Sequence, residues 1–260
     1  MQGDPVDNNN HMVYCARIST KGFEFIYERK AMNPENFHQS TCAACGAVSD
    51  QAAPPFLSAT APPDFDTRPG EPVRSTLLEW VQHCPECGYA ADDISKIAEG
   101  VREIVSSTEY RQLAQDSALP EQARPFLSYA LILEQLQAYS DAGWCALHAA
   151  WVCDDLKAQE SANRSRERTI LLWKRGKELG SGFMDSQAEE FAVAADVYRR
   201  IGQFEAARNA CNVALDGSQL PAGIDAMLRR QLVLIASEDT SPHSVDEITV
   251  PPGQAARVEL

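Results

Sequence analysis

Four cysteines stand in two CxxC pairs, and their spacing predicts a metal site. The pairs are CAACG at 42–46 and CPECG at 84–88. A Zn²⁺ ion takes four thiolates at about 2.3 Å in a tetrahedron, and each CxxC turn can supply two of them. Gly46 and Gly88 follow the pairs, and glycine readily takes the positive φ that closes such a turn. We predict one structural zinc ion, with iron in the same geometry as the alternative. The predicted ligands are Cys42, Cys45, Cys84 and Cys87.

The other cysteines predict no further chemistry. Cys145, Cys153 and Cys211 lie in helical patterns, where a free cysteine usually behaves as a small buried apolar residue. Cys15 lies in a predicted strand and is uninformative. A thioredoxin-like redox pair is an alternative for one doublet alone, but two glycine-terminated doublets in a region of strands and loops favour metal binding.

Two histidines lie near cysteines, and neither is needed as a ligand. His148 lies between Trp144 and Trp151 in a helical pattern, so we expect a core histidine. His83 directly precedes Cys84, where its side chain should point away from the metal.

The composition restricts the class of partner. The chain has 260 residues, a formal net charge of −14 and a pI near 4.8. This acidity disfavours nucleic acid and anionic membranes as default partners. The sequence has no apolar run of about 20 residues and begins with a polar stretch unlike a secretory signal. We therefore expect a cytoplasmic protein, whose cysteines bind metal rather than form disulfides.

The elements that must position the cysteines form a first region at residues 13–91. VYCARIST and FEFIYER flank Lys21-Gly22, the pattern of a hairpin. Six prolines between positions 54 and 72 exclude helix and inner strand there. The stretch LLEWVQH at 77–83 is predicted as a strand that leads into the second cysteine pair. The 38 residues between the pairs imply an insertion in a zinc-ribbon-like β domain.

A second region, residues 92–237, has helical periodicity. Apolar residues recur from Ile94 to Val105, with Asp92 or Asp93 as the predicted N-cap. Pro120, Pro125 and Pro221 are predicted to start helices, and Gly180-Ser181-Gly182 to break one. We expect seven or eight helices. Residues 1–12 are predicted as a disordered tail, and residues 238–260 as a polar tail in which a small hairpin is the alternative.

One stretch, FAVAADVYRRIGQFEAARNACNVAL at 191–215, is typical of a tetratricopeptide (TPR) helix pair. Ala195, Ala207 and Ala214 would let the two helices approach closely, and Tyr198 and Phe204 would fill the gaps. The upstream helices have the size of such repeats but not the residues, so an ordinary helical bundle is the alternative. The predicted fold class is α+β, with the small β domain followed by an all-α TPR-like domain.

A resemblance to a known family follows from the second cysteine pair. The run Asp64-Phe65-Asp66, then Trp80-Val81, then CPECGYA at 84–90 resembles an uncharacterised bacterial family, domain of unknown function 2225. The resemblance is good over residues 41–91, and in the helical region only the general helical pattern is similar. The first pair departs from the family pattern because it reads CAACG rather than CPxCG. The resemblance implies a metal site with TPR-like helices and implies no activity.

Charged clusters outside the cysteine pairs have two interpretations. Asp64, Asp66, Arg68 and Glu71 could line an acid–base site, but solvated turn residues beside proline and glycine are favoured. The basic runs NRSRER (163–168) and YRR (198–200) are predicted as solvated helix faces, with Arg199 and Arg200 on the outer side of their helix.

Two functional classes follow from these patterns. The first is a zinc-stabilised adaptor or scaffold that binds a basic or apolar polypeptide through its TPR-like helices. The second is an enzyme of unknown reaction, with a site at the domain junction around Asp64–Glu71. Nucleic-acid binding ranks lower, because residues 13–96 carry seven Lys/Arg against eleven Asp/Glu. No glycine-rich phosphate loop, nucleophile elbow or HExxH motif is present, so no catalytic residue is assigned.

Overall fold

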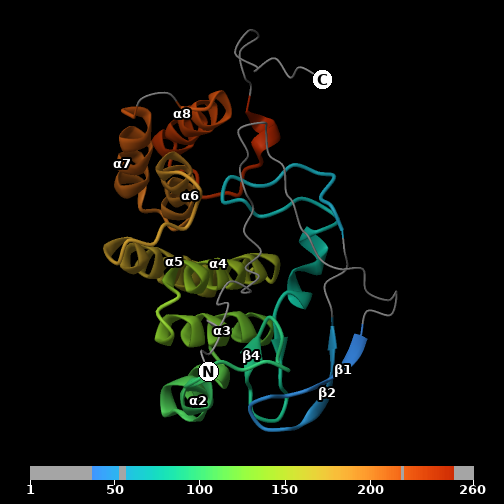
Figure 1. The fold of residues 1–260 in the computed structure, drawn as a ribbon. Coiled ribbons are helices and arrows are strands. Elements are labelled where there is room, and N and C mark those ends of the chain that lie inside the picture. Colours follow the sequence, from blue (N-terminus) through green and yellow to red (C-terminus); the bar gives the residue numbers. More distant parts are fainter. Residues whose placement is uncertain (1–36, 53–56, 218–219, 249–260) are drawn as a thin grey trace, which may run out of the picture.

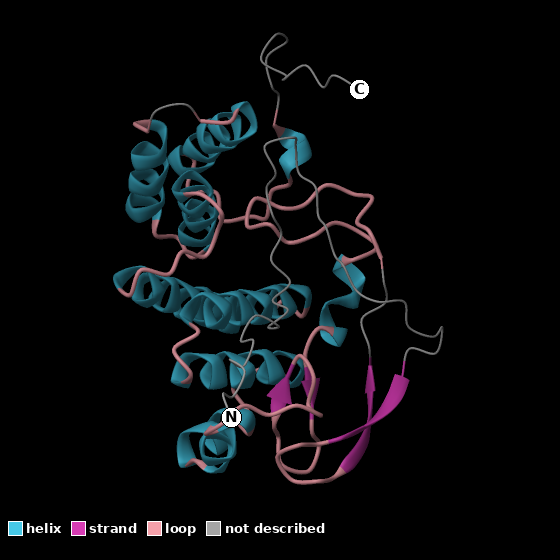
Figure 2. Ribbon diagram, viewed as in Figure 1, coloured by secondary structure: helices cyan, strands magenta, loops and turns pink. Residues whose placement is uncertain are grey.

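The helices stack in one column, and the strands and long loops lie along one side of it (Figures 1 and 2). This arrangement comes from a computed structural model, which describes residues 37–52, 57–217 and 220–248. The hairpin predicted around Lys21-Gly22, the tail at 1–12 and Cys15 lie outside the described residues. Among the described helices, none is long and apolar enough to cross a membrane.

Two short antiparallel hairpins form the region before the helices. Strands β1 (Phe37–Thr41) and β2 (Val48–Ala52) flank the first cysteine pair, and β3 (Gln82–His83) and β4 (Ala90–Ala91) flank the second. The side chain of Gln51 joins the hairpins, because its Nε2 donates to the carbonyl of His83 at 3.0 Å and its Oε1 accepts from the His83 N–H at 3.2 Å. The predicted small β region is confirmed.

Two predicted elements take a different form. Of the stretch 77–83 predicted as a strand, the first three residues end a 3₁₀ helix, η1 (Arg74–Glu79), and only the last two form β3. The helix predicted from Ile94 begins later, as α1 (Val101–Ser106), after Gly100 at φ 82°. The reason is a contact with a distant segment: the Ile94 carbonyl accepts from the Ala43 N–H at 2.8 Å, so residues 92–100 form turns against the first cysteine pair.

The remaining helices follow the predicted starts and breaks. Pro125 lies in the first turn of α3, Pro221 precedes α8, and Pro120 precedes the short 3₁₀ helix η2 (Glu121–Ala123). Residues 179–186 separate two helices at the predicted glycine break. The helices are α2 (Thr108–Ala114), α3 (Arg124–Gln135), α4 (Tyr139–Asp155), α5 (Gln159–Glu178), α6 (Gln187–Arg200), α7 (Phe204–Leu215) and α8 (Ala222–Ala236).

Three helix–helix turns share one geometry. Gln137, Lys157 and Gly202 have φ of 63°, 58° and 75° in the turns after α3, α4 and α6. In each turn the next residue donates its N–H to a carbonyl five residues earlier, at 2.8–2.9 Å. A fully buried alanine follows on the next helix in all three cases. Those alanines are Ala142, Ala162 and Ala207. The same turn is thus built from three different local sequences, only one of which contains glycine.

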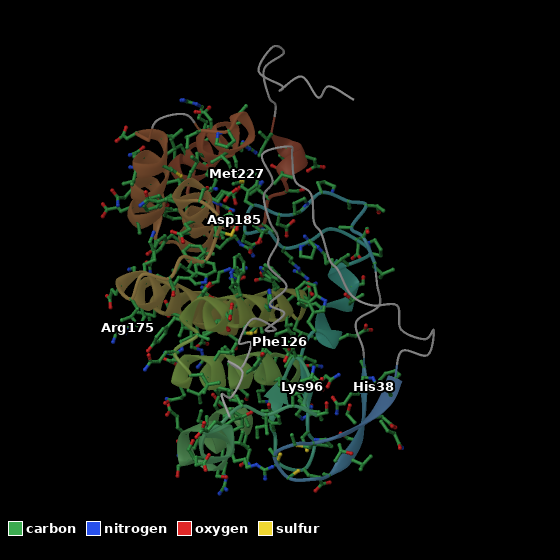
Figure 3. All side chains as sticks on the ribbon, in the orientation of Figure 1. His38, Lys96, Phe126, Arg175, Asp185 and Met227 are labelled. Carbon is green, nitrogen blue, oxygen red and sulfur yellow. The ribbon has the colours of Figure 1, made fainter. Side chains whose placement is uncertain are left out.

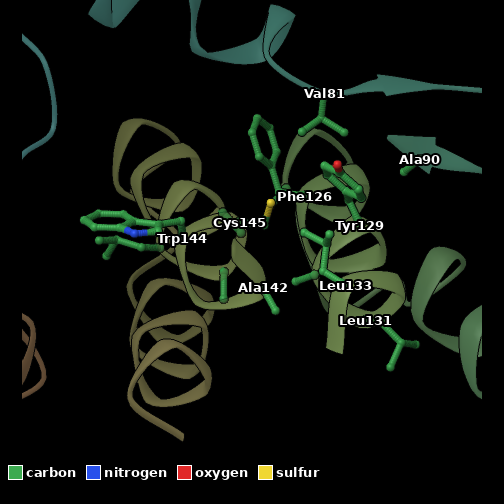
Figure 4. Close-up of a cluster of buried hydrophobic side chains, with 14 of the residues drawn as sticks. Val81, Ala90, Phe126, Tyr129, Leu131, Leu133, Ala142, Trp144 and Cys145 are labelled. Carbon is green, nitrogen blue, oxygen red and sulfur yellow. The ribbon is translucent and has the colours of Figure 1, made fainter. Parts of the chain in front are cut away.

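The two regions share a hydrophobic core rather than meeting at a flexible linker. Val81 and Ala90 of the hairpin region lie beside Phe126 and Tyr129 of α3 (Figure 4). Trp80 packs edge-on against Trp151 of α4, with ring centroids 6.4 Å apart. The hairpins are therefore supported by the helices as well as by the cysteine pairs.

The chain returns to the long loop after its last helix. Residues 238–260 were predicted as a polar tail, but His243 accepts from the Phe65 N–H and Pro63 accepts from the Val245 N–H, each at 2.9 Å. Asp64 and Ser244 form an isolated antiparallel bridge there. The alternative hairpin involves residues 249–260, which lie outside the described residues.

Candidate metal centre

The two cysteine pairs have the same backbone geometry. In the first, Cys42 donates its N–H to Ala47 and accepts at its carbonyl from the Gly46 N–H, both at 2.8 Å. Cys84 does the same with Tyr89 at 2.8 Å and Gly88 at 2.9 Å. The two glycines have φ of 81° and 74°, so the predicted left-handed conformation is confirmed. Each pair is a tight knuckle that directs two sulfur atoms to one side.

The four predicted ligands converge on one point. The Sγ atoms of Cys42 and Cys87 lie 3.7 Å apart, those of Cys45 and Cys84 lie 3.6 Å apart, and all four fall within 4.8 Å of one another. A tetrahedron with metal–sulfur bonds of about 2.3 Å has edges of roughly 3.8 Å. The cluster can therefore hold a metal ion. Its sulfur atoms gather where the two hairpin loops meet, at the lower end of the molecule in Figure 3.

Backbone N–H groups lower the pKa of the cluster thiols, and burial opposes them. Burial raises the pKa of the Cys42 thiol, although the N–H groups of Cys45 and Ala44 oppose it. The pKa of Cys45 is lowered, chiefly by the N–H of Ala47. Burial raises the pKa of Cys87 strongly, against the N–H of Tyr89. Bound metal supplies the positive charge that buried thiolates need, so binding will release protons.

Residues from α1 and α2 hold both knuckles in place. Arg102 of α1 donates to the carbonyls of Ala43 and Ala44 at 2.5 and 3.2 Å. The hydroxyl of Tyr110 on α2 donates to the Gly88 carbonyl at 2.9 Å. It also accepts from the Ala90 N–H at 3.1 Å. CxxC spacing does not predict these supports, because it contains no information about which distant side chain reaches the knuckle carbonyls.

Cys145, Cys153 and Cys211 are buried as predicted, and His148 is a core residue, although its buried Nε2 has no hydrogen-bond partner within the described residues. Burial raises the pKa of Cys153 to about 11 and of Cys211 to about 12, and it also raises the pKa of Cys145, so these thiols are protonated and unreactive. His148 is buried, packs on Trp80 and Trp151, and has its pKa lowered to about 3 by burial. It is a neutral core histidine.

The loop of residues 64–71, which we call the acidic loop, buries Asp66 and Arg68, which corrects the prediction of solvated turn residues there. Asp64 is half-buried, and Glu71 is exposed as predicted. Asp66 and Arg68 are 1% and 5% exposed. Asp66 accepts from the indole N–H of Trp151 at 2.8 Å, and Arg68 donates to Asp155 at 2.6 Å. Neighbouring Thr67 is also buried, with φ 69°. The loop lies against α4 because that helix supplies both polar partners.

The two basic runs are also buried in part, contrary to prediction. Arg166 from the first run and Arg199 from the second are 0% exposed, and Arg200 is 6% exposed. Each is paired: Arg166 and Arg200 donate to Asp154, and Arg199 donates to Asp196 at 2.6 Å. Burial alone would raise the pKa of Asp154, but the two arginines hold that pKa below its ordinary value.

These arginines and their carboxylate partners form one set, which we call the arginine network; its arginines are buried, whereas Asp155 is exposed. Its arginines come from the acidic loop, α5 and α6, and its aspartates come from α4 and α6. A sequence signal for it existed, since Asp196 interrupts the apolar run FAVAADVY three residues before Arg199. The network comprises Arg68, Arg166, Arg199 and Arg200 with Asp154, Asp155 and Asp196.

Comparison with known proteins adds no relationship: no family model, no curated protein and no solved structure matches this chain. The resemblance to domain of unknown function 2225 therefore stays a proposal, and functional inference depends on the geometry alone.

Proposed function

We propose that this protein is a zinc-stabilised cytosolic adaptor that binds another polypeptide through its TPR-like helices. The observation that carries the proposal is the pairing of a four-cysteine cluster with a column of helices. Four thiolates complete a tetrahedral zinc site and leave no open position for substrate, so the metal would act structurally. Iron is the alternative ion, and metal analysis of protein purified without chelator separates the two.

The TPR-like character is supported by the shared turns. TPR arrays stack helix pairs through repeated short turns and small residues, which allow close approach. Here Ala195, Ala207 and Ala214 are buried between α6, α7 and α8, as the sequence pattern predicts. The equivalent turns after α3 and α4 extend the same packing rule upstream of the pair with TPR residues.

The acidic loop limits where a partner could bind. Phe65 is 1% exposed within the core formed by α6, α7 and α8, so this loop covers part of the helical surface as a bound peptide would. A partner must use the surfaces that remain open. The net charge of −14 favours a basic partner, or an apolar one with basic flanks.

The enzyme alternative is less well supported. The carboxylate of Asp66 is engaged with Trp151 and the backbone, and Asp64 pairs with Arg74 at 2.6 Å. These contacts use the groups that acid–base chemistry would need. Nucleic-acid binding also has little support, since the ribbon is acidic on balance.

Photo-crosslinking from defined positions tests the adaptor proposal. Val213 on α7 and Val233 on α8 are 43% and 58% exposed, and Val48 on β2 is a matched control at 61%. A crosslinking amino acid at either helical position should recover the same polypeptide from lysate, whereas the Val48 position should not. Recovery from Val48 alone, or none from any position together with turnover of a small molecule, contradicts the proposal.

A further inference from the structure

A cleft of about 500 Å³ lies between the second knuckle and the first helices. Cys87 and Gly88 form one side, and residues of α1, α2 and α3 form the others. Its floor includes buried Val105 and Ser128. This volume is within the range of about 300–1,000 Å³ that holds drug-sized ligands, so the cleft can accept a few residues of an extended chain.

Four charged side chains line this cleft, two of each sign. Arg111 of α2 and Arg124 of α3 are the cations, and Glu86 of the knuckle and Glu121 of η2 are the anions. Within the described residues, none of the four makes an ion pair. The arginine network differs sharply, since every one of its arginines is paired with a carboxylate.

The guanidinium of Arg124 is held with one edge unused. Its Nη1 donates to the Ala114 carbonyl at the end of α2, at 3.3 Å. Its Nε is buried and has no hydrogen-bond partner. A carboxylate pairs with N–H groups of a guanidinium, and the Nη2 of Arg124 makes no hydrogen bond within the described residues. The fixed position of Arg124 favours an oxyanion ligand over a chance surface contact.

We propose that this cleft binds an extended peptide segment that carries one acidic and one basic side chain. The acidic side chain pairs with Arg111 and Arg124, and the basic one pairs with Glu86 and Glu121. Charge complementarity carries this assignment, because a ligand with charges of only one sign would be repelled by the two lining side chains of that sign. The inference rests on the proposed polypeptide-binding function and locates one contact of the partner.

Blocked tetrapeptides test the cleft directly in metal-loaded, full-length protein. Three probes are compared: aspartate and lysine separated by two alanines, two lysines so separated, and two aspartates so separated. Saturation-transfer NMR should show that the mixed peptide binds about tenfold more tightly than either other probe. Equal binding of the three probes, or no binding of the mixed peptide, overturns the proposal.

Single substitutions separate recognition from folding. Arg111 is exposed and its side chain makes no hydrogen bond within the described residues, so Arg111→Gln should fold normally and weaken binding of the mixed peptide about fivefold. Arg208→Gln removes the same charge from exposed α7 and should leave binding unchanged. Arg111→Glu combined with Arg124→Glu should reverse the preference toward the dilysine peptide. Equal effects of Arg111→Gln and Arg208→Gln would contradict the site.

The same variant distinguishes this inference from the adaptor proposal. If Arg111→Gln recovers the crosslinked partner as well as the unsubstituted protein does, the cleft assignment fails and the adaptor function stands. If the mixed peptide binds but no polypeptide is recovered from α7 or α8, the adaptor proposal fails and the cleft assignment stands.

Discussion

The metal centre and the arginine network both join segments that are far apart in the sequence, but their chemistry differs. The metal centre brings Cys42 within 3.7 Å of Cys87 through groups that need an added ion. The network joins Arg68 to Asp155, 87 positions away, with charges that the chain itself supplies. The metal centre depends on the supply of metal, whereas the arginine network depends on keeping each buried arginine paired.

Loss of the metal is the largest effect that the comparison predicts. Cys84→Ser should reduce bound metal from about one ion per chain to near zero. It should unfold the hairpins, since structural zinc can contribute on the order of 10 kcal/mol to the folding of a small domain. Elemental analysis and hydrogen exchange at residues 37–52 and 82–91 measure both. Cys145→Ala, a buried thiol outside the cluster, should retain the metal; full metal occupancy in Cys84→Ser would contradict the assignment.

Breaking the network should cost less and leave the metal bound. Arg166→Met leaves Asp154 buried with one arginine fewer, a change that typically costs about 3–5 kcal/mol. Denaturant unfolding at constant metal occupancy measures the loss. The matched control is Arg229→Gln, which removes an exposed pair with Asp225 on α8 and should cost less than about 0.5 kcal/mol. Equal costs for the two variants would show that the network is not a clamp.

The acidic loop next to the network should make stability depend on pH. Burial and the neighbouring charge of Asp66 raise the pKa of Asp64 to about 6, although Arg74 opposes the shift. Between its ordinary pKa of 3.8 and about 6 the folded state keeps a proton that the unfolded state releases. The contribution of Asp64 to stability is therefore present below pH 4 and is lost as the pH rises through 6.

Asp64→Asn should remove this pH dependence of the free energy of unfolding, which amounts to at most about 3 kcal/mol. The free energy of unfolding, measured from pH 4 to 7 in both proteins, shows the difference. A pH dependence that is the same in the variant would mean that Asp64 is not its source.

The smallest expected effect concerns the knuckle backbone. Gly46 has φ 81°, with open space where a Cβ would lie. Gly46→Ala should therefore cost only the strain of the left-handed conformation, about 1–2 kcal/mol, and should keep the metal. By contrast, Gly70→Ala places a Cβ 2.2 Å from the Ala61 carbonyl oxygen and should destabilise the acidic loop more strongly. Thermal melts of both variants test this order.

The sequence predicts the metal centre well and the network poorly, for a physical reason. Two CxxC pairs determine nearly all of their local geometry, so spacing alone identifies Cys42, Cys45, Cys84 and Cys87. An arginine on a helix is usually solvated, and nothing local to Arg199 or Arg200 shows that Asp239 and Asp154 will meet them. The helix predicted from Ile94 starts later for the same reason: the Ile94 carbonyl accepts a hydrogen bond from Ala43, which lies in another segment.

The return of residues 243–245 to the acidic loop determines the order in which a growing chain can complete its contacts. The last metal ligand is Cys87, so the metal cluster can close once the first third of the chain has left the ribosome. The partners of Pro63 and Phe65 are Val245 and His243, respectively, which are made almost 160 residues after Cys87. At about 5–20 residues per second this interval lasts roughly 8 to 30 seconds. During synthesis the acidic loop is therefore attached to a completed metal cluster before the helices that bury it have been made.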